Sequence, residues 1–501
     1  MFSAVGYFFG RGLQGKLEVP VGIIHSSWSG SPSEAWTSKG AFESDPELKA
    51  GAEKSETEVT IYPEHLQSYV LSLSNWEEST GRKDHPFSGV PLDGWQPAKI
   101  PGKINDAGAV WLRCTMQVPA DQAGKLMSIN LGQIRGVDQI YWNGVCVGNA
   151  SREQVVMRRG ERRQVIPAAQ VKAGEAVLAV RIFSSAEDIV LSRDIEAGRW
   201  SRSAWELKTE FNLPVLSDEA KTSLPVSPGM QPESWRAASH LYNAMIHPLI
   251  PYAIKGAIWY QGEGNTGRAY QYRKAFPLLI NGWRSQWGQG DFPFYFCQLA
   301  NFNGKQSAPS ESSWAELREA QAHTLALPHA GQAVLIDLGE AGDVHPRNKA
   351  DVGARLAAIA LARTYGVSIP FSGPVYESMK IENGKIRLTF GQTTGGLTAK
   401  PLPATYSVNS FAGKTAPLVH NSQKSELEGF AICGADKKWK WADAKIEDSQ
   451  VVVWSDQVAV PVAVRYGWAD NPTCNLYNRA GFPASPFRTD DFAMNTATVR
   501  Y

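Results

Sequence analysis

Short apolar runs alternate with segments of helical periodicity at the start of the chain and again in its middle. Apolar runs of strand length lie at residues 19–24, 256–260, 292–300 and 332–338. Apolar positions recur at helical spacing at residues 3–17, 269–287, 314–327 and 348–364. Strands that alternate with helices favour an open parallel sheet. The pattern therefore predicts an α/β core in which residues 19–24 form a buried strand.

Two other regions have the pattern of antiparallel β structure. From about residue 94, strand-like runs are separated by Pro, Gly and Asn turns, and Asn143-Gly144 is a strong hairpin signal. After residue 373 a second such region has hairpin chemistry at Asn383-Gly384. We therefore expect an α/β core at residues 1–60 and 228–372, an inserted β-sandwich at 90–215 and a C-terminal β domain at 374–501.

Three tryptophans fall in the predicted sandwich, namely Trp95, Trp111 and Trp142. Tryptophan rings can stack on sugars, and in β-sandwiches they more often fill the core. The sequence leaves both interpretations open.

Composition narrows the classes of partner. The 501 residues suggest roughly three domains at about 150 residues each. Lys and Arg total 50 against 49 for Asp and Glu, so nothing indicates a nucleic-acid or membrane-surface partner. The five cysteines are far apart, which indicates isolated buried thiols and no disulfide framework or zinc site. No apolar run approaches the roughly 20 residues of a membrane span. A small molecule or a glycan is the expected partner.

Three polar loops leave predicted strand ends, at residues 26–30, 261–265 and 339–345. The carboxyl ends of parallel strands meet at one edge of a sheet, where functional groups gather. Asp343 precedes His345 by two residues, so its carboxylate can accept from imidazole Nδ1–H and leave Nε2 free as a general base. The alternative is a structural hydrogen bond at a helix start. The Asn265 amide and the backbone N–H of Gly30 could bind a developing oxyanion.

A helix is also expected to begin directly after the first of these loops. Ser31, Pro32 and Glu34 fit the N-cap, first and third positions of a capping box. Free backbone N–H groups would then point toward Gly30. A helix start without any chemistry is the plainer interpretation.

Several motifs together resemble one known family. They are Ser27-Trp-Ser-Gly-Ser-Pro32, Gly256-Ala-Ile-Trp-Tyr-Gln-Gly-Glu-Gly-Asn265, Leu317-Arg-Glu-Ala-Gln321 and Asp343-Val-His-Pro-Arg-Asn-Lys349, with a C-terminal segment at 477–488. These motifs resemble the sialate O-acetylesterase family of the SGNH hydrolases. The resemblance implies an SGNH-type open parallel sheet, flavodoxin-like with three layers, and a galactose-binding-like inserted sandwich.

The resemblance also implies an activity and a set of site residues. The activity is removal of O-acetyl groups from sialic acid by Ser-His-Asp acyl transfer, with no metal or cofactor. His345 and Asp343 would be catalytic, Gly30 and Asn265 would form the oxyanion hole, and Gln261 and Arg318 would bind substrate. Alternatives are an esterase for acetylated xylan or another hemicellulose, and a catalytically silent glycan-binding protein. The family suggests a periplasmic or secreted protein, and the oligomeric state is open.

The sequence departs from the family at the nucleophile. The family carries it in Gly-Gln-Ser-Asn after the first strand, and no such motif occurs in these 501 residues. Ser26, Ser27, Ser29 and Ser31 do not match that position, and Ser29 replaces a glycine of the family's Trp-Gly-Gly. We therefore expect a chain that begins late and lacks its nucleophile and central strand. Residues 19–24 should then lie across an empty slot from residues 256–260 or collapse onto them.

Overall fold

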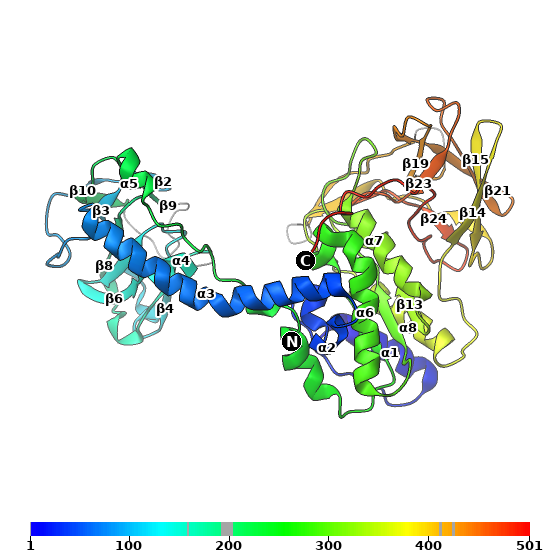
Figure 1. Ribbon diagram of the computed structural model, residues 1–501, viewed down its shortest axis with the longest axis horizontal. Coiled ribbons are helices and arrows are strands. Elements are labelled where there is room, and N and C mark those ends of the chain that lie inside the picture. The colour runs from blue at the N-terminus through cyan, green and yellow to red at the C-terminus, as the bar shows by residue number, and fades with distance from the viewer. Residues whose placement is uncertain (1, 158–159, 192–203, 410–412, 423–425) are drawn as a thin grey trace. The chain divides into compact units, whose positions relative to one another are not determined.

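The computed structural model of the protein describes residues 2–157, 160–191, 204–409, 413–422 and 426–501 (Figure 1). The chain divides into two compact units. One unit combines Met1–Glu56 with Ser234–Tyr501, and the other is Thr57–Glu233. Helix α3 (Pro46–Ser79) begins within Met1–Glu56 and continues into Thr57–Glu233. No helix in the described ranges is both long and apolar enough for a membrane span.

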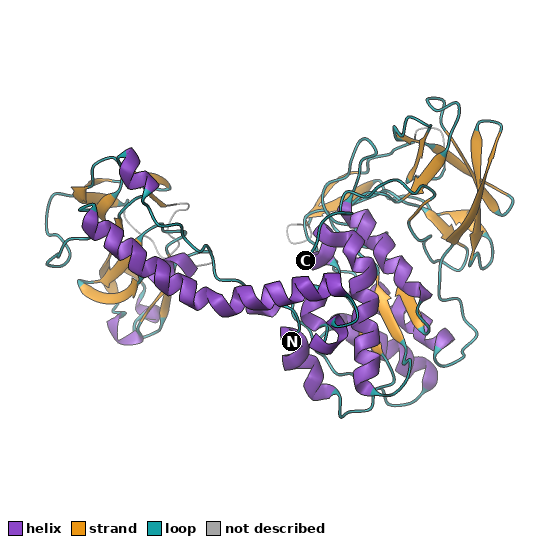
Figure 2. Cartoon of the chain, in the orientation of Figure 1, coloured by secondary structure: helices purple, strands orange, loops and turns teal. Residues whose placement is uncertain are grey.

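The first unit is built on a parallel sheet, as predicted. Its strand order is β11 (Ala257–Trp259), β12 (Phe294–Cys297) and β13 (Ala330–Ala333). Both strand pairs are parallel, with Trp259 opposite Phe296 and Phe296 opposite Gln332. The strands are shorter than the apolar runs that predicted them, and the sheet lies among the helices of this unit (Figure 2).

Helices cover both faces of this sheet because the side chains of β12 alternate. Phe294 and Phe296 pack in one apolar cluster with α6 (Ala269–Trp287) and α7 (Ser313–His323). Tyr295 and Cys297 pack in a second cluster with α1 (Ala4–Leu17) and α8 (Lys349–Arg363). All four residues of β12 are buried, and full burial of each large apolar side chain contributes about 1.5–3 kcal/mol.

The predicted helix starts of α1 and α8 are confirmed. The Ser3 hydroxyl accepts from the Gly6 N–H at 3.1 Å. The Asn348 side chain accepts from the Asp351 N–H at the same distance. Each bond satisfies one of the four N–H groups that a helix leaves open at its start.

The predicted strand at residues 19–24 is wrong. The segment forms no strand in the described structure, and Val19 and Ile24 are 49% and 54% exposed. An apolar run becomes a strand only when a neighbour pairs with its backbone, and no strand pairing reaches this segment within the described residues. A cavity lies between its end and β11, and Ile23, Ile24, Ile258 and Tyr260 all contribute to its wall.

The capping box at Ser31 is also wrong. Residues Ser33–Trp36 form a single 3₁₀ turn (η1) without a side-chain cap. The Ser31 hydroxyl instead donates to the Trp28 carbonyl and accepts from Trp36 Nε1, both at 2.7 Å. Tertiary partners therefore outcompete the local cap.

The C-terminal part of the first unit consists of two four-stranded sheets that share one core. The first sheet contains β14 (Val375–Glu382), β15 (Lys385–Gly391), β22 (Gln450–Trp454) and β21 (Asp443–Glu447). The second contains β20 (Lys440–Trp441), β19 (Phe430–Cys433), β23 (Ala463–Tyr466) and β25 (Phe487–Arg488). Two further pairs join β16 (Leu397–Ala399) to β24 (Leu476–Asn478), and β17 (Thr405–Asn409) to β18 (Lys414–Pro417). The Asn383-Gly384 turn has positive φ at both residues, as its hairpin role requires.

The second unit contains the antiparallel β structure predicted around residues 94–183. Its six-stranded sheet has the order β1 (Gln96–Pro97), β10 (Glu206–Asn212), β3 (Gly108–Val118), β8 (Gly174–Ser184), β5 (Val137–Trp142) and β6 (Val145–Ala150). Two pairs join β2 (Gly102–Asn105) to β9 (Ile189–Leu191), and β4 (Met127–Asn130) to β7 (Arg163–Ile166). Short helices lie at Arg152–Met157 (α4) and Asp218–Thr222 (α5).

The sandwich tryptophans divide between the two interpretations. Trp111 and Trp142 are fully buried, so they fill the interior and cannot stack on a sugar. Trp95 is partly exposed, and the Arg113 guanidinium lies 4.2 Å from its ring centroid.

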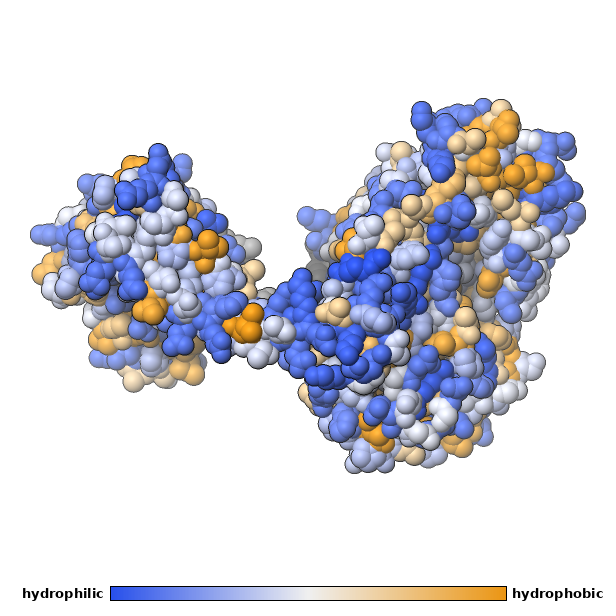
Figure 3. All heavy atoms as spheres, viewed as in Figure 1, coloured by the Kyte–Doolittle hydropathy of each residue, from blue (hydrophilic) through white to orange (hydrophobic). Residues whose placement is uncertain are grey.

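Other surface features change the picture little. Three of the five cysteines are buried as expected, whereas Cys146 is exposed. On the face drawn in Figure 3, hydrophobic residues gather in small groups among hydrophilic ones.

Candidate active site

A cavity of about 490 Å³ lies at the carboxyl end of β11. Its wall takes residues from all three loops that the sequence analysis placed at this edge, including Gly30, Gln261 and His345. Residues from the start of α1 and from residues 23–31 close the other side. The structure therefore brings together segments that lie more than two hundred positions apart in the chain.

Asp343 orients His345 at the edge of this cavity. Asp343 Oδ1 lies 3.0 Å from His345 Nδ1 and also accepts the His345 backbone N–H at 2.9 Å. The carboxylate is buried and the imidazole is 68% exposed. With Nδ1 engaged, Nε2 is the ring nitrogen available for proton transfer.

The loop that carries Asp343 rests on the C-terminal β structure. The Ala341 N–H donates to the Ser407 carbonyl of β17 at 3.1 Å. Gly342 lies so close to the next residue of β17 that a Cβ there would be 2.0 Å from the Val408 carbonyl oxygen. Only glycine fits at that contact without a backbone shift.

Gly30 and Asn265 are placed differently. Gly30 lines the cavity with φ of +74°, a conformation that glycine adopts without strain. The Asn265 side chain is buried behind the wall, where Oδ1 accepts from Ser33 N at 2.9 Å and Nδ2 donates to Glu34 at 2.8 Å. Asn265 is not among the residues that line the cavity.

Gln261 contributes to the cavity wall, but its amide is already bonded on the protein side. Nε2 donates to the Ser31 carbonyl at 3.0 Å and to Asn265 Oδ1 at 2.7 Å. Oε1 accepts from the Tyr272 hydroxyl at 3.0 Å. These bonds connect the end of β11 to the loop that contains Gly30.

The structure does not bring Arg318 to this cavity. Its guanidinium is fully buried and donates to five acceptors on two segments of the chain. They are the carbonyls of Leu299, Ala300, Ala469 and Asp470, and Oδ1 of Asn301, at 2.6–3.2 Å. Burial lowers the pKa of Arg318 to about 10.

Glu263 and Lys349 lie on the cavity wall, and the sequence analysis did not single out either of these ionisable residues. Burial raises the pKa of the Glu263 carboxyl, and the charges of His345 and Lys349 oppose the rise. Burial lowers the pKa of Lys349, whose ammonium lies 5.4 Å from the Tyr260 ring centroid. Glu263 lies in the polar stretch directly after β11, and that position was the available signal.

The nearby serines are held in different ways. Ser27 Oγ lies 2.6 Å from His25 Nε2, and both residues line the cavity. Ser26 donates to the Met245 carbonyl at 3.1 Å. Ser27 is therefore the serine among Ser26, Ser27 and Ser31 that an imidazole contacts.

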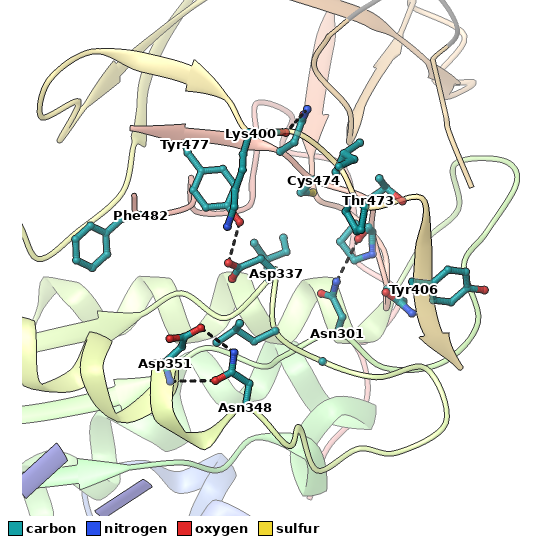
Figure 4. Close-up of a pocket in the computed structure, with 18 of the residues that line it drawn as sticks. Asn301, Asp337, Asn348, Asp351, Lys400, Tyr406, Thr473, Cys474, Tyr477 and Phe482 are labelled. Carbon is teal, nitrogen blue, oxygen red and sulfur yellow. Dashed lines mark hydrogen bonds between the residues drawn. The ribbon is translucent and has the colours of Figure 1, made fainter. Parts of the chain in front are cut away.

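A second cavity, of about 610 Å³, lies between the end of β13 and the C-terminal β structure (Figure 4). Its polar groups are largely paired with one another. The Tyr477 hydroxyl donates to Asp337 at 2.8 Å, and Asn348 donates to Asp351 at 2.7 Å. Arg355 also donates to Asp337 at 2.6 Å. No histidine is among the described residues that line it, so the cavity beside His345 is the better candidate for chemistry.

Comparisons with known proteins agree on one family. Residues 226–362 match the family model described as carbohydrate esterase, sialic acid-specific acetylesterase. The sialate O-acetylesterase of Mus musculus is 30% identical over 302 residues, which are 54% of this chain and 51% of that protein. Its Homo sapiens counterpart is 30% identical over 280 residues, or 50% of this chain and 48% of that protein. The crystal structure of a carbohydrate acetylesterase from Xanthomonas citri matches at 27% identity and a TM-score of 0.45, over 75% of this chain and 100% of that one.

Residues 226–362 therefore match a carbohydrate esterase family model. The Mus musculus and Homo sapiens relatives are sialate O-acetylesterases, so the resemblance to that family predicted from the sequence is confirmed. The chain spans about half the length of the relatives it matches. Asp343, His345, Asn265, Gln261 and Arg318 lie inside the matched range, and Gly30 lies outside it.

Proposed function

We propose that the protein is a carbohydrate O-acetylesterase that removes acetyl groups from sialic acid by acyl transfer, on an SGNH-type three-layer α/β fold with a galactose-binding-like sandwich inserted. The observation that carries this proposal is the 3.0 Å contact between Asp343 and His345 Nδ1 at a cavity that Gly30 also lines. The family match supports the choice of an acetylated sugar as substrate.

In this proposal His345 moves the proton in both half-reactions. Nε2 takes the proton of a serine hydroxyl as its oxygen attacks the acetyl carbonyl carbon, and Asp343 stabilises the imidazolium that forms. The same proton passes to the sugar oxygen as the ester C–O bond breaks. Water then repeats the sequence, and acetate leaves the serine.

The oxyanion that forms during each attack needs donors fixed in advance. The Gly30 N–H is the donor we propose at the cavity wall. Asn265 was the second donor expected from the sequence, but its side chain is buried behind the wall and bonded to Ser33 and Glu34, so we do not assign it that role. Loss of one such donor typically lowers kcat by about 10²–10³. We keep Gln261 as a proposed substrate contact, because it contributes to the cavity wall. The Arg318 guanidinium lies away from the cavity, and we propose no substrate contact for it.

The proposal requires a nucleophilic serine at the cavity. The printed sequence has no Gly-Gln-Ser-Asn, and Ser27 is the cavity serine with an imidazole partner. A fluorophosphonate probe followed by peptide mapping tests whether Ser27 is reactive. Labelling at Ser27 would identify it as the nucleophile. Absence of any label would contradict acyl transfer through a serine of this chain.

The function itself is tested with a substrate panel. The protein is assayed on 9-O-acetylated N-acetylneuraminic acid, acetylated xylan and p-nitrophenyl acetate, with His345→Ala and the surface variant His65→Ala in parallel. Acetate release from the sialic acid that is lost in His345→Ala and kept in His65→Ala supports the proposal. Preference for xylan changes the substrate class. Release unaffected by His345→Ala excludes this residue as the base.

A further inference from the structure

Two tryptophans lie beside each other, and one of them lies at the candidate active-site cavity. Trp28 lines the cavity and is 50% exposed. The ring centroid of Trp235, which belongs to the 3₁₀ turn Ser234–Arg236 (η4), is 6.4 Å away with the ring planes at 38°. A half-exposed indole forgoes much of the free energy that its burial would supply. Exposed aromatic residues grouped at a cavity indicate binding, whereas scattered ones do not.

The backbone around this pair is held rigidly while the Trp28 ring is left open. The Trp28 carbonyl accepts from Ser31 Oγ, which itself accepts from the buried Trp36 Nε1. A Cβ on Gly30 would be 3.7 Å from Cη2 of Trp235, so that ring rests against the turn that follows Trp28. The two rings are thus positioned before any ligand arrives.

The wall of the same cavity is largely apolar but also carries polar side chains. Glu263, His345 and Lys349 contribute these groups. The cavity therefore has an aromatic part and a part with a carboxyl, an imidazole and an ammonium group. A pyranose ring has the matching division, because its axial C–H groups form an apolar face and its hydroxyls form polar edges. Ligand sites combine apolar and aromatic walls with a few placed polar groups in the same way.

We propose that Trp28, supported from behind by Trp235, forms a binding site for the pyranose ring of the glycan, in which the sugar stacks on Trp28 while Glu263, His345 and Lys349 contact its hydroxyls. That the acetyl ester of this sugar then faces His345 rests on the function proposed above. The stacking itself does not depend on hydrolysis.

The test measures sugar binding without an ester. The methyl glycoside of N-acetylneuraminic acid and xylotetraose are titrated into the wild-type protein and followed by saturation-transfer NMR. We expect the ring C–H protons of at least one sugar to receive the strongest saturation. Trp28→Ala should weaken its affinity about two- to tenfold, which corresponds to the loss of one aromatic contact. Trp28→Phe should retain most of the affinity, because it keeps an aromatic face.

Tyr252→Ala is the matched control, since Tyr252 is an exposed aromatic residue that does not line the cavity. It should leave binding unchanged. Equal affinity in wild type and Trp28→Ala, or no binding of either sugar by the wild type, overturns the inference. Binding that depends on Trp28 in a protein that hydrolyses no acetyl ester supports this site and contradicts the proposed function. Ester hydrolysis together with sugar binding that is unchanged in Trp28→Ala supports the proposed function and contradicts this site.

Discussion

Replacement of Arg318 separates a structural role from the substrate contact that the family resemblance implies. In Arg318→Met the side-chain volume is nearly kept and all five hydrogen bonds are lost. The acceptors lie at the end of β12 and in the loop at residues 469–470, so the guanidinium joins the α/β core to the C-terminal β structure. We expect the main effect to be on stability.

The magnitude follows from the acceptors left behind. A buried acceptor without a donor costs about 1–3 kcal/mol. If water or other donors satisfy all but two of the five, the loss is about 2–6 kcal/mol, a large part of the roughly 5–15 kcal/mol that stabilises a typical protein. Arg318→Lys should lose less, because an ammonium group still donates three hydrogen bonds from one point.

The assay is urea unfolding followed by circular dichroism, with sugar binding measured on the same samples. For an m-value of about 3 kcal/mol/M, the Met variant should unfold at about 0.7–2 M lower urea, and the Lys variant should lie between it and the wild type. Arg387→Met is the control, since Arg387 forms surface ion pairs that contribute little. An unchanged midpoint together with lost affinity for the sugar would refute the structural reasoning and restore the substrate role.

Three further predictions concern the cavity and its loop. Gly342→Ala should lower ester hydrolysis and thermal stability together, because its Cβ would overlap the Val408 carbonyl; an active, fully stable variant would contradict the close contact. Glu263→Gln should stabilise the protein at neutral pH, because burial raises the folded-state pKa of Glu263 above its unfolded value of about 4.3. The protonated carboxyl therefore favours the folded state. Its contribution to stability is fully present below the unfolded pKa and is lost as pH rises through the folded-state pKa. The gain in melting temperature should therefore disappear near pH 4, and a gain that persists there would show another cause. Ser27→Ala should slow hydrolysis of p-nitrophenyl acetate and remove fluorophosphonate labelling, since losing one triad member removes most of the rate; turnover and labelling that are unchanged in this variant would show that Ser27 is not the nucleophile.

Segments with a strong local signal were predicted well. Helix α6 begins and ends at the residues that its apolar stripe indicated, Ala269 and Trp287. The Asn143-Gly144 and Asn383-Gly384 turns have the positive φ angles that their residue types favour. Asp343 and His345 also lie as expected, because a spacing of two residues nearly fixes their contact.

Predictions that depended on tertiary partners were less accurate. Residues 19–24 are apolar enough for a strand, but no strand within the described part of the chain pairs with them. Ser31 has the local sequence of an N-cap, but its hydroxyl bonds to the Trp28 carbonyl and to Trp36 Nε1 instead. Arg318 and Asn265 belong to the family motifs, and on that ground they were predicted to contact the site. The motifs carry no information on the direction of either side chain.

The contact between β17 and the loop of Asp343 makes the position of the proposed general base depend on two distant parts of the chain. The loop packs against the Ser407 and Val408 carbonyls, more than sixty positions downstream of His345. A substitution that shifts β17 would therefore displace the imidazole without changing any residue of the cavity wall. An engineer who trims the C-terminal β structure to obtain a smaller protein would remove the surface against which the proposed base is aligned.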